Sequence, residues 1–316
     1  MVTLFTDSRM LDHVPPRGHP EQPRRLQTVL RHLSRIGLDR ACPSGTVREA
    51  TAAEILRVHT PEHLALVERY AQAGGGAIEI DTWMSSGSLL AARLAAGAAI
   101  EAVDSVVKGP GRRAACLVRP PGHHAVKDGP MGFCLFGNVA IAAGQAFEVH
   151  GMSRVMVVDF DVHHGNGTQD LFYDDPRLAF LSIHRYPFYP GTGAADETGT
   201  GAALGTKLNI PLPHGIARSE YHAAFERGLT KLADATRPEL VLVSAGFDAH
   251  AEDPVGDLGL EVEDFVTLTK LIAQVAETHA GGRLVSVLEG GYNLPILAGC
   301  VAAHLEALGA VPQPGR

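Results

Sequence analysis

The chain has 316 residues, of which 45% are hydrophobic and 20% charged, so it can bury a large core and is not a disordered chain. The net charge of −8 excludes the basic surface of a general nucleic-acid-binding protein, and we expect no direct binding to nucleic acid. The cysteines form no C-x-x-C pair, which argues against a zinc knuckle or a dithiol redox motif and predicts buried, reduced thiols at Cys42, Cys116, Cys134 and Cys300.

The first residues lack the charged and apolar regions of a signal peptide. The longest apolar stretch, residues 89–107, is interrupted by Arg93, Glu101 and Asp104, which predicts an amphipathic helix and not a membrane span. We therefore expect a cytoplasmic protein without a membrane partner.

Short β-branched runs alternate with helical patterns along the rest of the chain. The runs cover residues 114–118, 154–160, 179–183, 240–245 and 284–288, and the helical patterns cover 137–149, 219–235 and 262–279. This alternation predicts an α/β fold with a central, mainly parallel sheet and helices on both faces. No polar linker divides the chain, so residues 1–316 are expected to form a single domain.

A cluster of polar residues follows four of the predicted strands, at residues 119–124, 159–166, 246–253 and 289–292. Open α/β sheets bind ligands outside the carboxyl ends of their strands, where the loops converge. We therefore expect these four clusters to meet in one site.

The second cluster contains an Asp-x-His pair, Asp161 and His163. Side chains two residues apart at a strand end can point the same way, so these two could bind one metal ion. Asp248, after another strand, is the natural third ligand. Three protein ligands with one open position are typical of a catalytic zinc site, although an isolated Asp-x-His is weak evidence.

The remaining clusters supply groups that such a metal site would use. His123 and His124 follow Pro-Pro-Gly and could act as general base and general acid; the alternative is a pair of surface loop histidines. Tyr292 follows two glycines and could donate a hydrogen bond to a developing oxyanion, whereas an isolated tyrosine there would be a packed loop aromatic.

Four motifs together resemble the signature of the histone deacetylase superfamily, which includes acetylpolyamine amidohydrolases and acetoin-utilisation deacetylases. They are RPPGHHA (119–125), DFDVHHGNGTQ (159–169), SAGFDAH (244–250) and LEGGY (288–292), with similar segments at 18–26, 58–62, 132–134 and 189–193. The resemblance runs from about residue 5 to residue 293 in consistent order, and HHGNG is typical of the class II branch. It implies the single-domain arginase/deacetylase-like fold, with the active site at the carboxyl ends of the strands.

The resemblance also implies roles for individual residues. Asp161, His163 and Asp248 would bind one catalytic Zn²⁺ per chain, and Tyr292 would polarise the substrate carbonyl. The tandem histidines would be oriented by Asp159, as the partner of His123, and by Asn166, as the partner of His124. The neutral Asn166 favours His124 as the acid/base that protonates the leaving amine, and which histidine performs which transfer stays open. A structural K⁺ would lie at Asp159, Asp161, His163 and Ser182.

A narrow substrate channel is implied as well. Phe133 and Tyr189 would form its walls, with ordinary core packing as the alternative, and Gly132 would offer its backbone carbonyl near the inner end. Arg25 aligns with a basic residue of the acetate-exit cavity, while Gln22 stands where the family usually has an arginine. Val255 occupies the gatekeeper position at the mouth.

The expected reaction is hydrolysis of an acetyl (acyl) group from acetyl-lysine or a similar N-acyl amine by metal-activated water. The apolar Val255 argues against acetylpolyamines, unless an acidic residue such as Glu79, Asp81, Glu252 or Asp253 reaches the mouth. A non-catalytic acyl-lysine binder and an arginase-like enzyme with two metal ions are less favoured, because every catalytic position is present but no second ligand set is. A homo-oligomer is left open.

Overall fold

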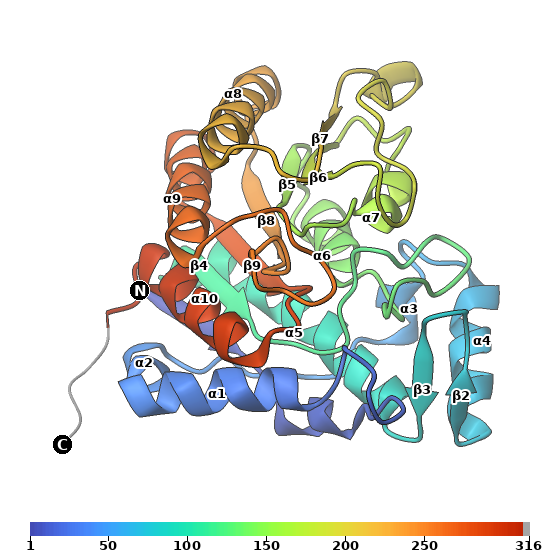
Figure 1. Cartoon of the computed structure of the whole chain (residues 1–316). Coiled ribbons are helices and arrows are strands. Elements are labelled where there is room, and N and C mark those ends of the chain that lie inside the picture. The colour runs from blue at the N-terminus through green and yellow to red at the C-terminus, as the bar shows by residue number, and fades with distance from the viewer. Residues whose placement is uncertain (312–316) are drawn as a thin grey trace.

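A sheet of seven strands runs through the molecule (Figure 1). The computed structural model describes residues 1–311. All neighbouring strands of this sheet are parallel, in the order β1-β4-β9-β8-β5-β6-β7. The strands are β1 (Val2–Phe5), β4 (Arg113–Cys116), β5 (Val155–Asp159), β6 (Leu178–Arg185), β7 (Lys207–Leu212), β8 (Leu240–Ala245) and β9 (Leu284–Leu288). The predicted parallel α/β sheet is confirmed.

The central strands β5, β8 and β9 are rich in Val and Leu, and every residue in them is buried. Such continuous apolar runs are typical of parallel strands covered on both faces, which is why the sequence predicted them. The two edge strands were missed. β1 has only four residues, and β7 carries Lys207, Asn209 and Pro211, of which a proline is tolerated mainly at a sheet edge.

Helices cover both faces of the sheet. α5 and α6 pack on one face, whereas α8 and α9 pack on the other, with α10 against α9 and α1 against α10. A small antiparallel hairpin, β2 (Gly75–Ala77) and β3 (Trp83–Ser85), lies beside α4 (Figure 1). The helices are α1 (Arg24–Ile36), α2 (Leu38–Ala41), α3 (Ala52–Ile55), α4 (Pro61–Gln72), α5 (Ser88–Lys108), α6 (Asn138–Glu148), α7 (Asn166–Leu171), α8 (Arg218–Thr236), α9 (Val262–His279) and α10 (Leu294–Ala307), with 3₁₀ turns η1 (Ser8–Asp12) and η2 (Gly201–Ala203).

The apolar stretch predicted as an amphipathic helix is α5, which is more deeply buried than its charges suggested. Its alanine-rich middle contacts β4 and β9 on one side and packs against α6. In the part of the chain that the structure describes, no helix is long and apolar enough to cross a bilayer. The four cysteines are buried and unpaired, as predicted.

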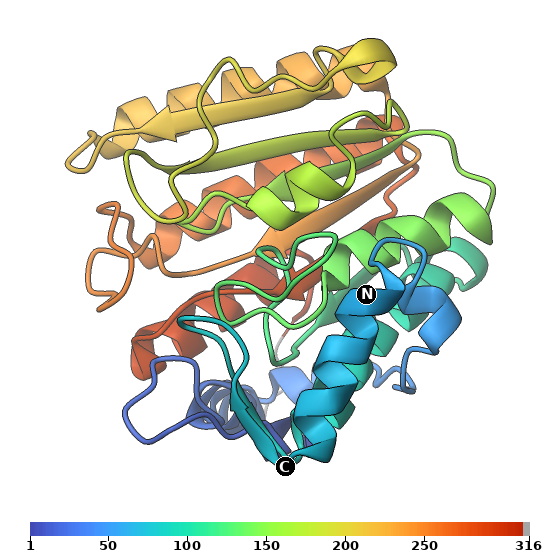
Figure 2. The ribbon, with the colours of Figure 1, turned by 90° about the vertical axis from the view of Figure 1, so that its right-hand side faces the viewer.

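The carboxyl ends of the strands lie on one side of the molecule, as Figure 2 shows for the strands seen side by side. Asp159 at the end of β5 lies in register with Ser182 of β6 and Ser244 of β8, and Ala245 of β8 pairs with Leu288 of β9. The loops that follow these strands therefore start at the same edge, which positions the four polar clusters side by side.

Candidate active site

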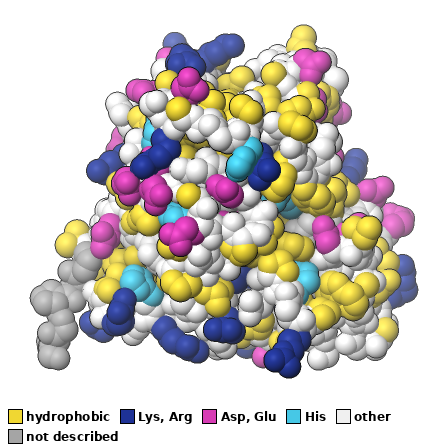
Figure 3. Space-filling view, viewed as in Figure 1, with side chains coloured by type: hydrophobic (Ala, Val, Ile, Leu, Met, Phe, Trp, Pro, Cys, Tyr) yellow, Lys and Arg dark blue, Asp and Glu magenta, His cyan; other side chains and the backbone are white. Residues whose placement is uncertain are grey.

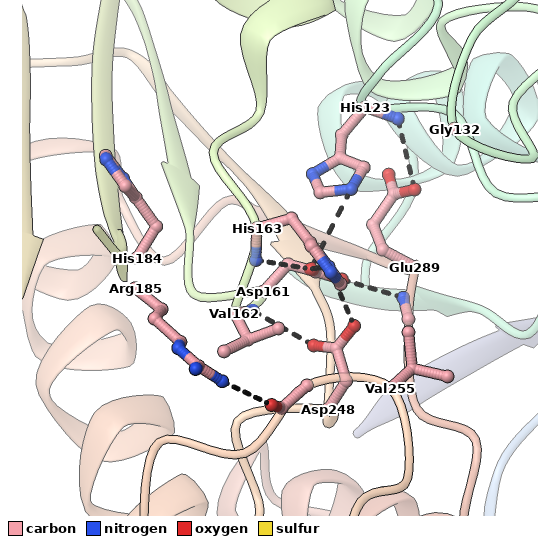
Figure 4. Close-up of polar contacts among 12 residues, drawn as sticks. His123, Gly132, Asp161, Val162, His163, His184, Arg185, Asp248, Val255 and Glu289 are labelled. Atoms are coloured by element: carbon pink, nitrogen blue, oxygen red, sulfur yellow. Dashed lines mark hydrogen bonds and ion pairs between the residues drawn. The ribbon is translucent and has the colours of Figure 1, made fainter. Parts of the chain in front are cut away.

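The proposed metal ligands meet at the carboxyl edge of the sheet (Figure 4). Asp161 and His163 follow β5, and Asp248 follows the neighbouring β8. Nδ1 of His163 lies 3.0 Å from Oδ1 of Asp161 and 3.3 Å from Oδ2 of Asp248. One candidate ligand atom from each residue lies within 4.8 Å of the others, and all three residues are buried. The sequence spacing thus becomes a compact group of two carboxylates and one imidazole.

The surroundings of this group fit a divalent cation. Oδ2 of Asp248 is buried without a hydrogen-bond partner, although its other oxygen accepts the N–H of Val162 at 2.9 Å. The N–H of Gly290 donates to Oδ2 of Asp161 at 2.9 Å, and a methyl group at Gly290 would overlap both carboxylates. A buried carboxylate oxygen without a partner is costly unless a cation binds it. Two carboxylates and one imidazole form the mixed donor set of a catalytic zinc site.

The tandem histidines lie beside the metal group, and their partners differ in charge. Nδ1 of His123 lies 2.9 Å from the carboxylate of Asp159, and Nδ1 of His124 lies 2.7 Å from the amide oxygen of Asn166. Burial opposes the charged form of His123, but the carboxylates of Asp159 and Asp161 outweigh it and raise its pKa to about 10. Burial and the positive charge of His123 hold the pKa of His124 well below its usual range. One histidine is therefore stabilised as a cation and the other as a neutral imidazole.

Tyr292 and Arg25 pack against each other next to the metal group. The Arg25 guanidinium lies 4.8 Å from the centre of the Tyr292 ring and is fully buried. Its Nε donates to the carbonyl of Gly291 at 2.6 Å, and a terminal nitrogen donates to the carbonyl of Glu289 at 2.5 Å. Arg25 holds the loop that carries Tyr292 and is not among the residues that line the main cavity. Its place at an acetate-exit cavity stays a prediction.

A cavity of about 230 Å³ leads to the metal group. It is lined by the four other residues predicted for the channel, Gly132, Phe133, Tyr189 and Val255, together with His124, His163 and Tyr292. Phe133 has a left-handed backbone (φ 69°), and its N–H donates to the Thr82 hydroxyl at 3.0 Å. On the face drawn in Figure 3, Lys and Arg side chains are interspersed with Asp and Glu.

Two residues of the site, Phe188 and Glu289, received no role from the sequence, whereas Asp81 was named there as one of four acidic residues that could reach the mouth. Phe188 lines the cavity and stacks on His163 at 5.2 Å between ring centroids, with the Arg185 guanidinium 4.2 Å from its ring. Asp81, from the β2–β3 loop, lines the cavity as well, and Glu289 lies beneath the tandem histidines. The aromatic character of the segment YPFYPG could have indicated Phe188. The sequence could not decide which of the four acidic residues reaches the cavity, because Asp81 lies between two short strands outside the main sheet.

Ser182, named for the K⁺ site, is buried on β6 next to Asp159. Its hydroxyl lies 2.9 Å from Nδ1 of His184, a histidine that the sequence did not single out. The K⁺ site itself stays a prediction.

The histone deacetylase domain profile matches residues 19–308. The chain is 41% identical to histone deacetylase 10, chloroplastic, of Oryza sativa subsp. japonica, covering 98% of this chain and 74% of the relative. It is 39% identical to the histone deacetylase-like amidohydrolase of Pseudomonas aeruginosa, covering 95% of this chain and 79% of the relative.

Two further matches come from a human relative and a solved structure. Identity to the human polyamine deacetylase HDAC10 is 41% over 95% of this chain and 46% of the relative. The crystal structure of the HDA15 HD domain superposes with a TM-score of 0.92 at 36% identity, covering 97% of this chain and 90% of that one. The chain therefore belongs to the histone deacetylase family.

Proposed function

We propose that this protein is a zinc-dependent deacetylase that removes acetyl (acyl) groups from acetyl-lysine or similar N-acyl amines. The observation that carries the proposal is the buried group of Asp161, His163 and Asp248 at the inner end of an aromatic cavity that His124 and Tyr292 also line. A metal-ligand group, an imidazole and a phenol facing one cavity are the parts that amide hydrolysis needs.

Asp161, His163 and Asp248 would hold the Zn²⁺ ion. When bound, zinc supplies Lewis-acid polarisation of the acyl oxygen and lowers the pKa of a bound water. The described residues contain one group of this kind, which favours a single metal ion over the two of an arginase-like enzyme.

His124 is the group that we assign to proton transfer. It lines the cavity, whereas His123 does not, and its neutral partner Asn166 leaves its ring uncharged and able to accept a proton. His123, paired with Asp159, would remain cationic and stabilise negative charge that develops nearby. The hydroxyl of Tyr292 would donate to the acyl oxygen as it becomes an oxyanion. The presence of these groups argues against a non-catalytic acyl-lysine binder.

The cavity favours a substrate with an extended alkyl chain. Phe133, Phe188 and Tyr189 supply aromatic surface that can desolvate methylene groups. Val255 adds an apolar side chain to the lining. Asp253, two residues away, does not offer its carboxylate to a ligand, because it accepts the backbone N–H groups of Val255 and Tyr292 at 2.9 and 2.6 Å. We therefore favour acyl amines with an uncharged flank.

One observation favours a second candidate, an acetylpolyamine or another small cationic amide. Asp81 lines the cavity, so a carboxylate is present near the path of the substrate. One of its oxygens is engaged by the N–H of Gly132 at 3.1 Å and by the Thr82 hydroxyl at 2.9 Å. A relative of this chain is named a polyamine deacetylase.

A kinetic comparison separates these substrates. Zinc-loaded protein would be tested with acetyl-lysine peptides, longer acyl-lysines, acetylputrescine and acetylspermidine, with kcat/KM measured for each. We expect acetyl-lysine substrates with neutral flanks to react fastest. A higher kcat/KM for acetylspermidine would replace this substrate with the polyamine, and zinc-loaded protein inactive on all of them would contradict the proposed function.

A further inference from the structure

Glu289 is a fully buried carboxyl group that the proposed mechanism does not use. It is the first residue after β9, three residues before Tyr292. Its Oε2 accepts two consecutive backbone N–H groups, from Gly122 at 2.6 Å and from His123 at 3.2 Å. Figure 4 shows the backbone nitrogen of His123 directed at this carboxylate. A side chain after one strand thus holds the loop after another, across more than 160 positions of sequence.

The segment around Glu289 is itself held on two other sides. The Arg25 guanidinium binds the carbonyls of Glu289 and Gly291 from behind, at 2.5 and 2.6 Å. In front, the N–H of Gly290 donates to Asp161 at 2.9 Å. Glu289 is therefore fixed relative to the metal group and to the loop of Tyr292, and it is a rigid support for whatever its side chain binds.

We propose that Glu289 is a positioning residue: its carboxylate holds the backbone of Gly122 and His123 and so sets where the imidazoles of His123 and His124 lie over the metal group. Glu289 is the only side chain from the segment after β9 that is hydrogen-bonded to the loop after β4, among the described residues. Without these bonds that loop would lose this support. The two imidazoles would then sample positions away from the cavity. This inference rests on the proposed deacetylase function.

The action of Glu289 through its acceptor oxygen can be separated from an effect of its charge. Burial raises the pKa of the Glu289 carboxyl to about 7, and Glu289→Gln removes the remaining charge while it keeps the size of the side chain. Glu289→Gln keeps an oxygen that can accept both N–H groups, whereas Glu289→Ala removes both bonds. Glu239→Ala is a matched control, because Oε2 of Glu239 also accepts two consecutive backbone N–H groups, of Ser153 and Arg154, at the opposite end of the sheet.

The kinetic test measures kcat and KM of zinc-loaded wild type and the three variants on the best acyl-amine substrate. Misplaced catalytic groups cost about 100-fold in rate, so we expect Glu289→Ala to lose about that factor in kcat with KM changed less than about threefold. Glu289→Gln should stay within about fivefold of wild type and Glu239→Ala should match wild type. Folded, zinc-loaded Glu289→Ala with wild-type kcat would overturn the proposal.

A second readout does not depend on activity. The backbone amide protons of Gly122 and His123, followed by NMR in the intact protein, should be shifted downfield by their bonds to the carboxylate. This shift should persist in Glu289→Gln and disappear in Glu289→Ala. If Glu289→Ala does not fold, Glu289→Gln decides: a loss of kcat as large as 100-fold with both amide protons still downfield would overturn the positioning role. If the wild type has no deacetylase activity, the proposed function is refuted. The amide proton shifts would then still test whether Glu289 holds the loop of Gly122 and His123.

Discussion

The two ends of the strands in the central sheet, their carboxyl and their amino ends, differ in how charged side chains are placed. At the carboxyl edge, Asp159, Asp161, Asp248 and Glu289 are fully buried and bind groups from distant loops. At the amino ends of the strands, ion pairs such as Arg177–Asp175, at 2.7 Å, are partly exposed. Lys207 is the exception: it is buried there and donates to the carbonyl of Leu178 at 2.7 Å.

The burial of carboxylates at the carboxyl ends of the strands marks that end as the catalytic one. Burying a carboxylate is costly unless hydrogen bonds or a cation compensate, and at the carboxyl edge one oxygen of Asp248 and one of Glu289 have no partner. Exposed pairs such as Arg177–Asp175 contribute little and are easily replaced. Removing a metal-binding or catalytic side chain at the carboxyl ends of the strands should therefore impair function, whereas changes at the amino ends should alter stability alone.

The largest expected effect is the loss of a metal ligand. Asp248→Ala should remove bound zinc and abolish turnover, because two remaining ligands do not make a catalytic site. Elemental analysis of purified protein measures the metal, and Asp196→Ala, which changes an exposed aspartate, is the control. Full zinc occupancy in Asp248→Ala would take Asp248 off the ligand set.

The second effect concerns the phenol. Tyr292→Phe should keep zinc and KM but reduce kcat by about 10²–10³, the usual cost of removing one oxyanion donor. Its hydroxyl acts when charge develops on the acyl oxygen, so ground-state binding should change little. Tyr70→Phe, on α4, provides the control. An unchanged kcat would mean that Tyr292 does not reach the carbonyl.

A smaller effect is expected at the mouth of the cavity. Val255→Glu should raise kcat/KM for acetylspermidine, relative to a neutral acetyl-lysine substrate, by about fivefold, since a solvent-exposed ion pair is worth up to about 1 kcal/mol. Val255→Gln controls for size without charge. If both variants shift the ratio equally, charge at this position does not select the substrate.

The smallest effect belongs to the amino edge. Burial favours the neutral form of Glu239, but the N–H of Ser153 and the charge of Arg154 hold its pKa below the usual 4.5. Its stabilisation is therefore fully present above the unfolded-state pKa and is lost as the pH falls from there through the lower folded-state pKa. Glu239→Gln should lower the free energy of unfolding by at most about 1 kcal/mol at pH 7, with kcat unchanged.

Urea unfolding measures this difference. The gap between wild type and Glu239→Gln should narrow as the pH is lowered below the usual pKa of 4.5, because the carboxylate then becomes protonated in the folded chain as well as in the unfolded one. A gap that widens at low pH would reverse the sign of the argument. A loss of kcat in Glu239→Gln would contradict the expectation that changes at the amino ends of the strands affect stability alone.

Much of this architecture could be read from the sequence because it depends on local pattern. Runs such as VMVVD and LVLVSA predict buried parallel strands, and the polar residues directly after them predict a site at the carboxyl edge. The pairing of Asp161 with His163 followed from the two-residue spacing at a strand end. Short edge strands such as β7 lack a pattern strong enough to be recognised.

The tertiary structure alone decided what depends on distant segments. The sequence by itself determined the fold class, the family resemblance and the residues that could bind a metal, because each rests on local patterns: strand and helix runs for the fold, and several short motifs for the family and the ligands. Only the folded chain showed that Asp81, from a small hairpin, lines the cavity, that Arg25 packs against Tyr292 and that Glu289 lies beneath His123. These contacts join residues far apart along the chain, and their distances depend on how whole helices and strands pack, which no local pattern of residues records.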